Sequence, residues 1–497
     1  MTLQFETTPV ATPPAWSALA ARQPGGRMAA SMAPALTGHP DGITRLLAGA
    51  HCVTTGQQPG LLGGPLYTLY KAATAIAIAR RLDAVPVFWV AGDDHDFAEA
   101  NHLWLLGSDN VPTKLTLRER PEDATSLPMY RERVGDDIEA IIAGVIAQSP
   151  PTEFRDRVMA QVREAYRPER SLAQAFAGLL AAWLGPHGLV VLDPTHRSVK
   201  ERVVPLLLQS LERAGDLDAA LAARARALSL AGSPTPVHVG DGATLVMVEG
   251  DLGRDRLVIA GTDFTTRRSG ERLCLDDIRA LASSQPERLS PNVLLRPVIE
   301  AAILPTVAYV GGPGELAYFP QCDPVYESLG VSPQARLGRW SARLVEPKVT
   351  KVLEKFSIRA QDLALPEGQL EARLVRDAIP TEATTAITTL RQTLATEYDR
   401  LREAAVAVDP TLRKPVESQR GQALAGVADV EKRIVHHLKQ QNDILVQQVA
   451  KARANLMPLG KPQERVFGSV PFLIRYGTAF IDLVLTETEA WVATWPG

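Results

Sequence analysis

The segment at 51–92 constrains the fold of this chain most strongly. An apolar strand, a glycine-rich loop (TGQQPGLLGG), a helical run rich in Ala and Leu, and a second apolar strand follow one another at 51–54, 55–64, 65–83 and 85–92. Pro65 stands where the helix would begin, a position that suits proline because its missing N–H would have no helical partner there. A strand that is apolar on both faces is typical of a parallel sheet covered by helices. The segment therefore predicts a βαβ unit and an α/β fold.

Polar residues follow both strands of this unit at their carboxyl ends. The loop that opens at Thr55 follows the first strand, and the acidic run GDDHDF at 92–97 follows the second. A right-handed crossover brings those two ends to the same edge of the sheet, and open α/β sheets bind ligands at that edge. We therefore expect the glycine-rich loop and the acidic run to face one site.

Weaker patterns extend this core. The sequence predicts helices at 171–185 and 198–215, strands at 188–196 and 306–310, and an antiparallel pair within 236–261. The dipeptide Asp241-Gly242 is typical of a hairpin turn, so we expect the antiparallel pair to turn there.

A glycine-poor segment from Ala378 to about Leu456 has a different character. Apolar residues recur there at helical spacing, at Ile387, Leu390, Leu394, Leu401 and Val408 and again at Leu424, Val427, Ile434, Leu438 and Leu445. The segment DPTLRKP at 409–415 breaks the run, so the pattern predicts a helical hairpin. Its second arm of roughly 35 residues would be about 50 Å long, which favours coiled-coil dimerisation. The alternative is that the stripe formed by these apolar residues packs on the core. We expect the turn-rich segment from Pro458 to return to the core.

Composition narrows the class of protein. The 497 residues are 45% hydrophobic and 22% charged, as in ordinary globular proteins, and the length predicts about two to four domains. A net charge of −3 disfavours a protein that binds nucleic acid over its whole surface. Three well-separated cysteines exclude a disulfide framework and a Cys/His zinc site, and they are typical of a reducing cytoplasm. The chain shows neither a secretory signal pattern nor 18 consecutive apolar residues, so we expect no membrane span.

The glycine-rich loop is the first motif that could carry chemistry. Its backbone N–H groups, together with a helix N-terminus, favour a bound anion, and Gln57 and Gln58 are unusual in a mere turn. The letters match neither GxGxxG nor a Walker A sequence, so a tight turn that needs glycine for steric reasons stays open. Lys71, two turns into the helix, either reaches a phosphate or is solvated.

The acidic run contains the sharpest cluster, Asp93, Asp94, His95 and Asp96. Neighbouring carboxylates raise one another's pKa, which favours a bound cation or partner. The cluster suits a metal, an ammonium group or a ribose, or general acid/base chemistry at His95, and Glu99 and His102 could add metal ligands. The alternative is a capped helix start with a solvated acidic turn.

A second glycine loop, GGPGELAYF, follows the strand at 306–310. Its glycines permit a close approach of the backbone to a ligand, whereas Glu315 could simply stabilise the first turn of a helix. Tyr318 either stacks on a ligand or fills the core. We interpret Cys322 as a bystander thiol, because no base is identifiable beside it.

Four motifs together resemble one known family. TGQQPGLLGGPLYTLYKA, PVFWVAGDDHDFAEANH, LRPVIEAAILPTVAYVGGPGELAYF and PLGKPQER are similar, in this order, to segments of the cysteine ligase family of bacillithiol biosynthesis, BshC. The resemblance implies a Rossmann-like, nucleotidyltransferase-like core with inserted segments and a coiled coil that forms a homodimer. It also implies the last pathway step, in which cysteine is joined to glucosaminyl-malate through an amide bond, with ATP and Mg²⁺ as expected co-substrate. Neither a HIGH nor a KMSKS signature is present.

The resemblance assigns site residues and boundaries. It implies a catalytic role for Asp94, His95 and Asp96. It implies substrate or nucleotide binding for Thr55, Gly56, Gln57, Gln58, Gly63, Gly64, Lys71, Asp93, Asn101, Gly311, Gly312, Gly314, Glu315, Tyr318, Gln463, Glu464 and Arg465. The expected domains are a core at 1–377 with insertions near 110–170 and 200–290, a hairpin at 378–457 and a returning segment at 458–497. We expect no tightly bound metal, no nucleic-acid partner and a cytoplasmic location.

Two other functions stay open at this point. One is a metal-dependent hydrolase built on Asp93, Asp94, His95 and His102; the other is a non-catalytic dimeric scaffold of the same pathway. The sequence also leaves open whether the cysteine carboxylate is activated as an adenylate or as an acyl phosphate.

Overall fold

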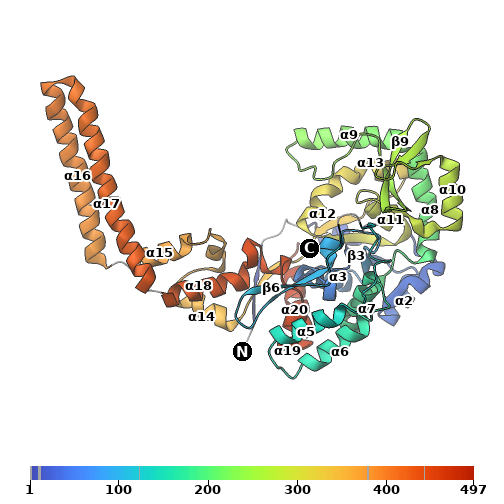
Figure 1. Cartoon of the computed structure of the whole chain (residues 1–497). Helices are drawn as coiled ribbons and strands as arrows, with labels where there is room; N and C mark the ends of the chain where they lie inside the picture. Colours follow the sequence, from blue (N-terminus) through green and yellow to red (C-terminus); the bar gives the residue numbers. More distant parts are fainter. Residues whose placement is uncertain (1–2, 9–12, 122–123, 378–379, 442, 497) are drawn as a thin grey trace. The chain divides into compact units, whose positions relative to one another are not determined.

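The computed structural model describes residues 3–8, 13–121, 124–377, 380–441 and 443–496. The chain forms two compact units (Figure 1). One comprises Phe5–Arg343 together with the C-terminal residues from Gln463, and the other comprises Leu344–Pro462 with the first few residues.

A six-stranded sheet forms the centre of the larger unit. In spatial order its strands are β14 (Ala335–Gly338), β13 (Thr306–Gly311), β3 (Cys52–Gln57), β4 (Val85–Val90), β7 (Val190–Leu192) and β2 (Leu36–Gly38). The first five run parallel, and β2 pairs antiparallel with β7. The predicted βαβ unit is therefore present, with α3 (Leu66–Arg81) connecting β3 to β4. The Rossmann-like α/β prediction is confirmed.

Helices cover both faces of this sheet, which is why its strands are apolar throughout. Along β3, Cys52 packs in a cluster with α8 (Arg197–Glu212) and α11 (Arg296–Ile303), whereas Val53 packs in a cluster with α3 and α20 (Ala479–Ala493). Successive residues of a strand face opposite sides. The last helix of the chain thus belongs to the core of this unit.

Two insertions separate the central strands. Between β4 and β7 lie α4 (Phe97–Ala100), β5 (His102–Leu106), β6 (Pro112–Thr116), α5 (Ile138–Gln148), α6 (Arg155–Ala165) and α7 (Leu172–Leu184). Between β7 and β13 lie α8, α9 (Ala214–Leu230), α10 (Leu275–Ser284), α11 and an antiparallel sheet of β11 (Arg272–Leu273), β10 (Asp263–Thr266), β9 (Gly253–Ala260), β8 (Ala243–Gly250) and β12 (Leu289–Pro291).

The predicted turn of the antiparallel pair is wrong. Strands β8 and β9 are joined through Asp251 and Leu252, and Asp241-Gly242 lies just before β8. Asp241 and Gly242 both have positive φ, at 59° and 69°. The dipeptide does form a tight bend, but this bend leads into the first strand and does not connect the pair.

The smaller unit contains the helical hairpin. Helices α16 (Thr381–Val408) and α17 (Arg413–Gln441) lie side by side (Figure 1), and Asp409 accepts a hydrogen bond from the Thr411 N–H at the break between them. The coiled-coil hairpin prediction is confirmed. Each end of the hairpin continues into shorter helices, α14 (Pro347–Lys355), α15 (Gln369–Asp377) and α18 (Asp443–Leu456).

The boundary of this unit differs from the expected one. We predicted a start at Ala378, which lies outside the described residues, and the compact unit begins at Leu344. The reason is a local apolar cluster, in which Val349 and Leu353 of α14 pack with Val449 and Leu456 of α18.

The remaining elements are short. They are β1 (Gln4–Thr7), α1 (Trp16–Ala20), α2 (Pro40–Leu47), α12 (Pro313–Tyr318), α13 (Asp323–Leu329), β15 (Ala342–Val345) and α19 (Val470–Tyr476). Among the helices of the described residues, none is both long and apolar enough to traverse a lipid bilayer.

Candidate active site

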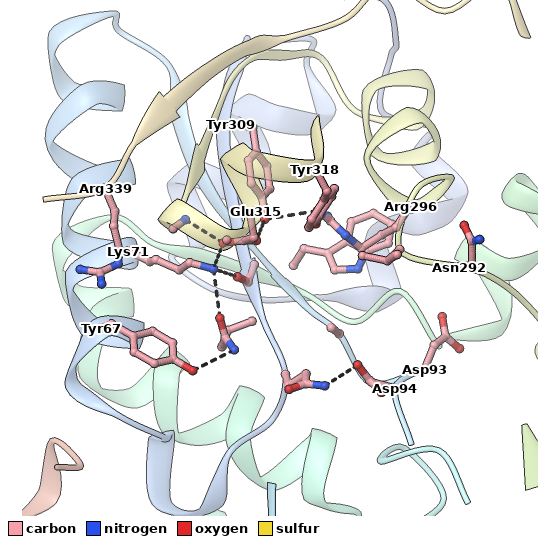
Figure 2. A pocket seen from close by; sticks show the side chains of 18 of the residues that line it. Tyr67, Lys71, Asp93, Asp94, Asn292, Arg296, Tyr309, Glu315, Tyr318 and Arg339 are labelled. Carbon is pink, nitrogen blue, oxygen red and sulfur yellow. Dashed lines mark hydrogen bonds and ion pairs between the residues drawn. The ribbon is translucent and has the colours of Figure 1, made fainter. Parts of the chain in front are cut away.

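A cavity of about 370 Å³ opens where β3, β4 and β13 end (Figure 2). It lies at the carboxyl edge of the parallel sheet, where the sequence placed a ligand site. Its lining residues are Gly56, Gln57, Gln58, Tyr67, Lys71, Trp89, Ala91, Asp93, Asp94, Arg254, Pro291, Asn292, Val293, Arg296, Tyr309, Gly312, Pro313, Gly314, Glu315, Tyr318, Arg339 and Arg465. Residues from all four sequence motifs therefore meet in one cavity.

Lys71 and Glu315 form an ion pair in the cavity wall (Figure 2). The Lys71 side chain is only 3% exposed, so the interpretation of a solvated lysine is wrong. Its Nζ also donates to Gly56 O at 2.8 Å and to Gln57 Oε1 at 3.0 Å. An ammonium group has three protons to donate, and here three protein acceptors are within reach of them.

Glu315 is held from three sides. Its carboxylate pairs with Lys71 and accepts hydrogen bonds from the Gly312 N–H, at 2.8 Å, and from the Tyr309 hydroxyl. Burial raises the pKa of Glu315, but Lys71 and these two hydrogen bonds outweigh it, so the pKa lies below its usual value. Burial lowers the pKa of Lys71, and Glu315 opposes that shift.

The two glutamines connect the glycine loop to other parts of the wall. Gln57 Nε2 donates to the Tyr67 hydroxyl at 3.2 Å, and Gln58 Nε2 donates to Asp94 Oδ2. Gly56 fits where a side chain would not, because an added Cβ would lie 2.9 Å from the Trp89 carbonyl oxygen. Both glutamines of the loop therefore form hydrogen bonds to other residues of the cavity wall.

The acidic run is divided between the cavity and a neighbouring hollow. Asp93 and Asp94 line the cavity, and Asp94 together with Gln58 also lines the hollow, in which His95, Asp96 and Asn101 lie. Asp94 Oδ1 accepts hydrogen bonds from the backbone N–H groups of His95, at 2.6 Å, and Asp96, at 3.2 Å. Asp94 thus fixes the turn and faces both spaces.

His95 has one nitrogen committed to a neighbour. Arg254 Nη1 lies 3.3 Å from His95 Nδ1, and a guanidinium can only donate. Nδ1 therefore accepts, and the neutral ring carries its proton on Nε2. Burial, with the positive charge of Arg254 next, lowers the pKa of His95. In this arrangement His95 presents a hydrogen-bond donor at neutral pH.

Asp96 and Asn101 have structural partners within the same segment. Asp96 is exposed and caps α4 by accepting from the Glu99 N–H at 3.0 Å. Asn101 is buried and donates to Arg118 O at 3.0 Å. The proposed catalytic role of Asp96 stays a prediction, with its side chain in the hollow and not in the cavity.

Several predicted site residues lie away from the cavity. Thr55 donates to Val310 O at 2.8 Å, between strands. The Gly63 N–H donates to the Tyr166 hydroxyl at 3.3 Å, and both Gly63 and Gly64 have positive φ, so they shape the loop. Gly311 ends β13 beside the cavity, and Gln463 is buried.

Glu464 reaches the site through an arginine. Its carboxylate accepts from Arg339 Nη1 at 3.0 Å and Nη2 at 2.5 Å, and both side chains are 6% exposed. Arg339 lines the cavity, as does Arg465, the neighbour of Glu464. In the fourth motif, Arg465 therefore faces the cavity itself, and Glu464 holds Arg339, which also faces it.

The sequence analysis identified Arg465 but missed the other three arginines of the wall, Arg254, Arg296 and Arg339, and most of its aromatic residues. Arg296 donates to Glu300 Oε2 at 2.7 Å and lies over the Tyr309 ring, 5.1 Å from its centroid. Glu300 is fully buried and accepts from Thr54, and burial raises its pKa. The spacing of Arg296 and Glu300, four residues apart on one helix, was the available signal. No sequence signal pointed to Arg254 or Asn292, because both come from the inserted segment between β7 and β13.

Positive charge predominates among the residues that line the cavity. Lys71, Arg254, Arg296, Arg339 and Arg465 face three carboxylates, Asp93, Asp94 and Glu315. Such a lining suits a ligand that carries several negative charges and one or more cationic groups. Burial raises the pKa of Cys322 to about 12, and this thiol is not among the lining residues.

The side chains considered for a metal turn to different partners. Asp93 bonds to Lys200, whereas His102 Nδ1 lies 3.0 Å from Ala98 O and 3.2 Å from Asn101 Oδ1. Among the described residues, no group of three or more His, Cys, Asp or Glu side chains is arranged to hold a metal ion.

Comparison with known proteins places this architecture in a family. Residues 33–334 match the profile described as "Bacillithiol biosynthesis BshC, N-terminal Rossmann-like domain", and residues 342–491 match "Bacillithiol biosynthesis BshC, C-terminal coiled-coil domain". This chain belongs to the BshC family. The second match extends to residue 491, although the residues from Gln463 pack with the Rossmann-like unit.

Individual BshC relatives are similar over nearly the whole chain. A Koribacter versatilis protein named "Putative cysteine ligase BshC" is 34% identical over 460 residues, 90% of this chain and 83% of the relative. A Thermus thermophilus protein and a Salinibacter ruber protein of the same name are each 34% identical, over 92% and 88% of this chain and 90% and 81% of their own lengths.

Proposed function

We propose that this chain is an ATP-dependent ligase that joins cysteine to glucosaminyl-malate by an amide bond, in the last step of bacillithiol biosynthesis. Its membership of the BshC family and the naming of its relatives support a cysteine ligase. The observation that carries the proposal furthest is the cavity, where five cationic side chains and three carboxylates meet at the edge of a Rossmann-like sheet.

The charges of the three substrates explain why such a mixed lining is useful. ATP, the cysteine carboxylate and the malate group bring negative charge, for which arginine is the best partner because its guanidinium binds carboxylate and phosphate in pairs of hydrogen bonds. Cysteine and the glucosamine moiety each bring an amine, for which Asp93 and Asp94 are the available carboxylates. Both requirements are met in one cavity.

The direct contacts with ATP would come from the arginines. Lys71 already has three protein acceptors, so we assign it to holding Glu315 and the loop at Gly56. Arg465 has no hydrogen-bond or ion-pair partner among the described residues, so it is available to an anionic group. Arg254, Arg296 and Arg339 can offer only the N–H groups that their own protein acceptors leave over. Mg²⁺ prefers oxygen ligands and keeps several waters, so it would enter with the phosphates, near the carboxylates of the wall.

Amide formation also needs control of protons around the reacting amine. The amine attacks the activated cysteine carboxyl only after it has lost a proton. Asp94, which faces both the cavity and the hollow, is placed to accept that proton or to orient the ammonium group. His95, with its proton on Nε2, is suited to stabilise negative charge as a donor.

We further propose that the hairpin forms a homodimer. Leu390, Leu401 and Val408 lie on α16, where they are 51%, 52% and 82% exposed within the chain. Positions 11 and 7 residues apart fall within about 20° of one another around a helix, so the three form one exposed apolar stripe. A second copy of the same helix is the partner that a coiled coil would supply.

A coupled assay tests the activity. The purified protein is incubated with cysteine, glucosaminyl-malate and Mg-ATP, and mass spectrometry measures the amide product together with AMP and ADP. Product with AMP supports an adenylate, and product with ADP an acyl phosphate. Absence of product from a folded protein would contradict the ligase and favour the scaffold.

Variants link any activity to this cavity. Arg465→Met removes an exposed cation that lines the cavity, and Arg279→Met removes an exposed one that pairs with Glu212 and Asp276 on the surface. We expect the first to lower kcat/KM by about tenfold or more, as for a lost charged hydrogen bond, and the second to leave it unchanged. Equal kcat/KM values for the two variants would contradict the assignment of the activity to this cavity.

A further inference from the structure

Lys200 is a buried lysine outside the cavity. It lies on α8, in the segment that follows β7, and its side chain is 2% exposed. An ammonium group is costly to bury unless it is paired and hydrogen-bonded. Its position therefore calls for specific partners.

The ammonium group of Lys200 connects the central sheet to the inserted one. Nζ donates to Asp93 Oδ1 at 2.5 Å, directly after β4, and to Leu289 O at 2.9 Å, at the start of β12. Asp93 lines the cavity, whereas Lys200 does not. Lys200 thus reaches the site only through Asp93.

Asp93 has one oxygen committed and one left over. Oδ1 accepts from Lys200, and no donor to Oδ2 is found in the part of the chain that the structure describes. The side chain is still 15% exposed, and it faces the cavity beside Asp94 (Figure 2). A cation in the cavity can therefore reach the second oxygen.

A purely structural role explains this pair poorly. Buried ion pairs are often matched or exceeded in stability by apolar side chains of similar volume, and the surroundings of α8 are apolar, with Val199, Val203 and Leu207 in the same core cluster. A methionine would pack there without needing a partner. What it could not do is fix one oxygen of a carboxylate at the rim of the cavity.

We propose that Lys200 is a positioning residue for Asp93. By holding Oδ1, it turns Oδ2 towards the cavity, where that oxygen binds the ammonium group of the acceptor amine. The choice of the acceptor rests on the proposed ligase function; the positioning of Asp93 does not.

Steady-state kinetics test the proposal. Lys200→Met should raise the KM for glucosaminyl-malate about 10- to 100-fold, the range of a lost hydrogen bond to a charged group, while the KM for ATP changes less than about twofold. Lys200→Arg should restore part of the loss, because a guanidinium can also donate to Asp93. Ser210→Ala is the matched control on the same helix, since its buried hydroxyl bonds to Leu207 O and to no other group in the described part of the chain.

A double-mutant cycle separates this role from a general effect on the fold. If Lys200 acts through Asp93, Lys200→Met in an Asp93→Asn background should add less than about threefold to the KM. Multiplied effects of the two substitutions, or an unchanged KM in Lys200→Met, would overturn the proposal. If Lys200→Met does not fold, the same cycle is measured with Lys200→Gln.

Crystal structures keep this test independent of the reaction. In Lys200→Met the Asp93 carboxylate should leave its position at the cavity wall, and an unmoved carboxylate would overturn the proposal. A wild-type protein that forms no product would contradict the ligase function, and the structures would still decide the position of Asp93.

Discussion

At the scale of single residues, the ion pair of Lys71 and Glu315 shows how the site depends on compensated charge. Both groups lie in the cavity wall, and removing one leaves the other charged and poorly solvated. Lys71→Met should therefore lower the free energy of unfolding by about 3–5 kcal/mol. The double variant Lys71→Met/Glu315→Gln should recover most of that loss, because it leaves no buried charge. Urea denaturation of the four proteins measures the cycle, and simple addition of the two losses would contradict it.

The same pair has a definite pH dependence. The pKa of Glu315 is lower in the folded protein than its usual value of 4.5. Its contribution to stability is therefore complete above pH 4.5 and is lost as the pH falls through the folded-state pKa. We expect Glu315→Gln to weaken the acid sensitivity of the fold in this range.

His95 gives a second pH prediction, in a different range. Its pKa is below 6.5 in the folded protein, because of burial and because Arg254 and Arg268 outweigh Asp94 and Asp96. The unfolded chain then binds more protons as the pH falls below 6.5, so the folded state loses stability there. Between pH 7.5 and 5.5, the denaturant midpoint of His95→Gln should therefore fall by less than the midpoint of the wild type. Equal losses would show that this ring titrates normally.

At the scale of elements, β3 lies too close to β4 at Gly56, next to the end of the strand, to leave room for a side chain. Gly56 pairs with Trp89, and an added Cβ would lie 2.9 Å from its carbonyl oxygen. Gly56→Ala should lower the free energy of unfolding by about 1–3 kcal/mol, as overpacking does. At Gly314, on α12, an added Cβ would meet no atom within 4 Å, so Gly314→Ala should raise the free energy of unfolding by a few tenths to about 1 kcal/mol. Thermal unfolding of both variants tests the contrast, which a destabilised Gly314→Ala would contradict.

Elements of strong periodicity were predictable because the signal is local. The unit of β3, α3 and β4 and the two arms of the hairpin follow from apolar patterns and turn residues alone. The crossover rule also placed two motifs, the glycine-rich loop and the acidic run, at one edge of the sheet. The hairpin turn between β8 and β9 was missed because Asp241-Gly242 is a turn signal in two contexts, and only strand pairing distinguishes them.

At the scale of the whole molecule, much of the part of the site that was not predicted is supplied by insertions. Arg254, Asn292 and Lys200 come from segments between β7 and β13, and their approach to Asp93 and His95 depends on how an inserted sheet packs on the core. No local pattern encodes that packing. Family resemblance identified the motifs, but it did not identify the side chains of the inserted segments that contact them.

The hairpin provides the last prediction at this scale. Its inner face is occupied within the chain, since Ile387 and Leu394 on α16 are partly buried and Val427 on α17 is buried. Leu390 and Leu401 lie beside these residues, at the edge of the same face, and are half exposed. Because burial of leucine side chains stabilises association by roughly 1.5–3 kcal/mol each, a second copy would gain most at these positions.

Leu390→Glu/Leu401→Glu should therefore convert a dimer into a monomer while the fold of the chain is retained. Gln392→Glu adds a like charge to an exposed position of the same helix that points away from the stripe, and it should leave the dimer intact. Light scattering after size exclusion measures the mass, and circular dichroism checks the helices. A wild-type monomer, or a dimer unaffected by both glutamates, would place any association elsewhere. If the monomeric variant keeps full ligase activity, each cavity works alone and the stripe serves assembly only.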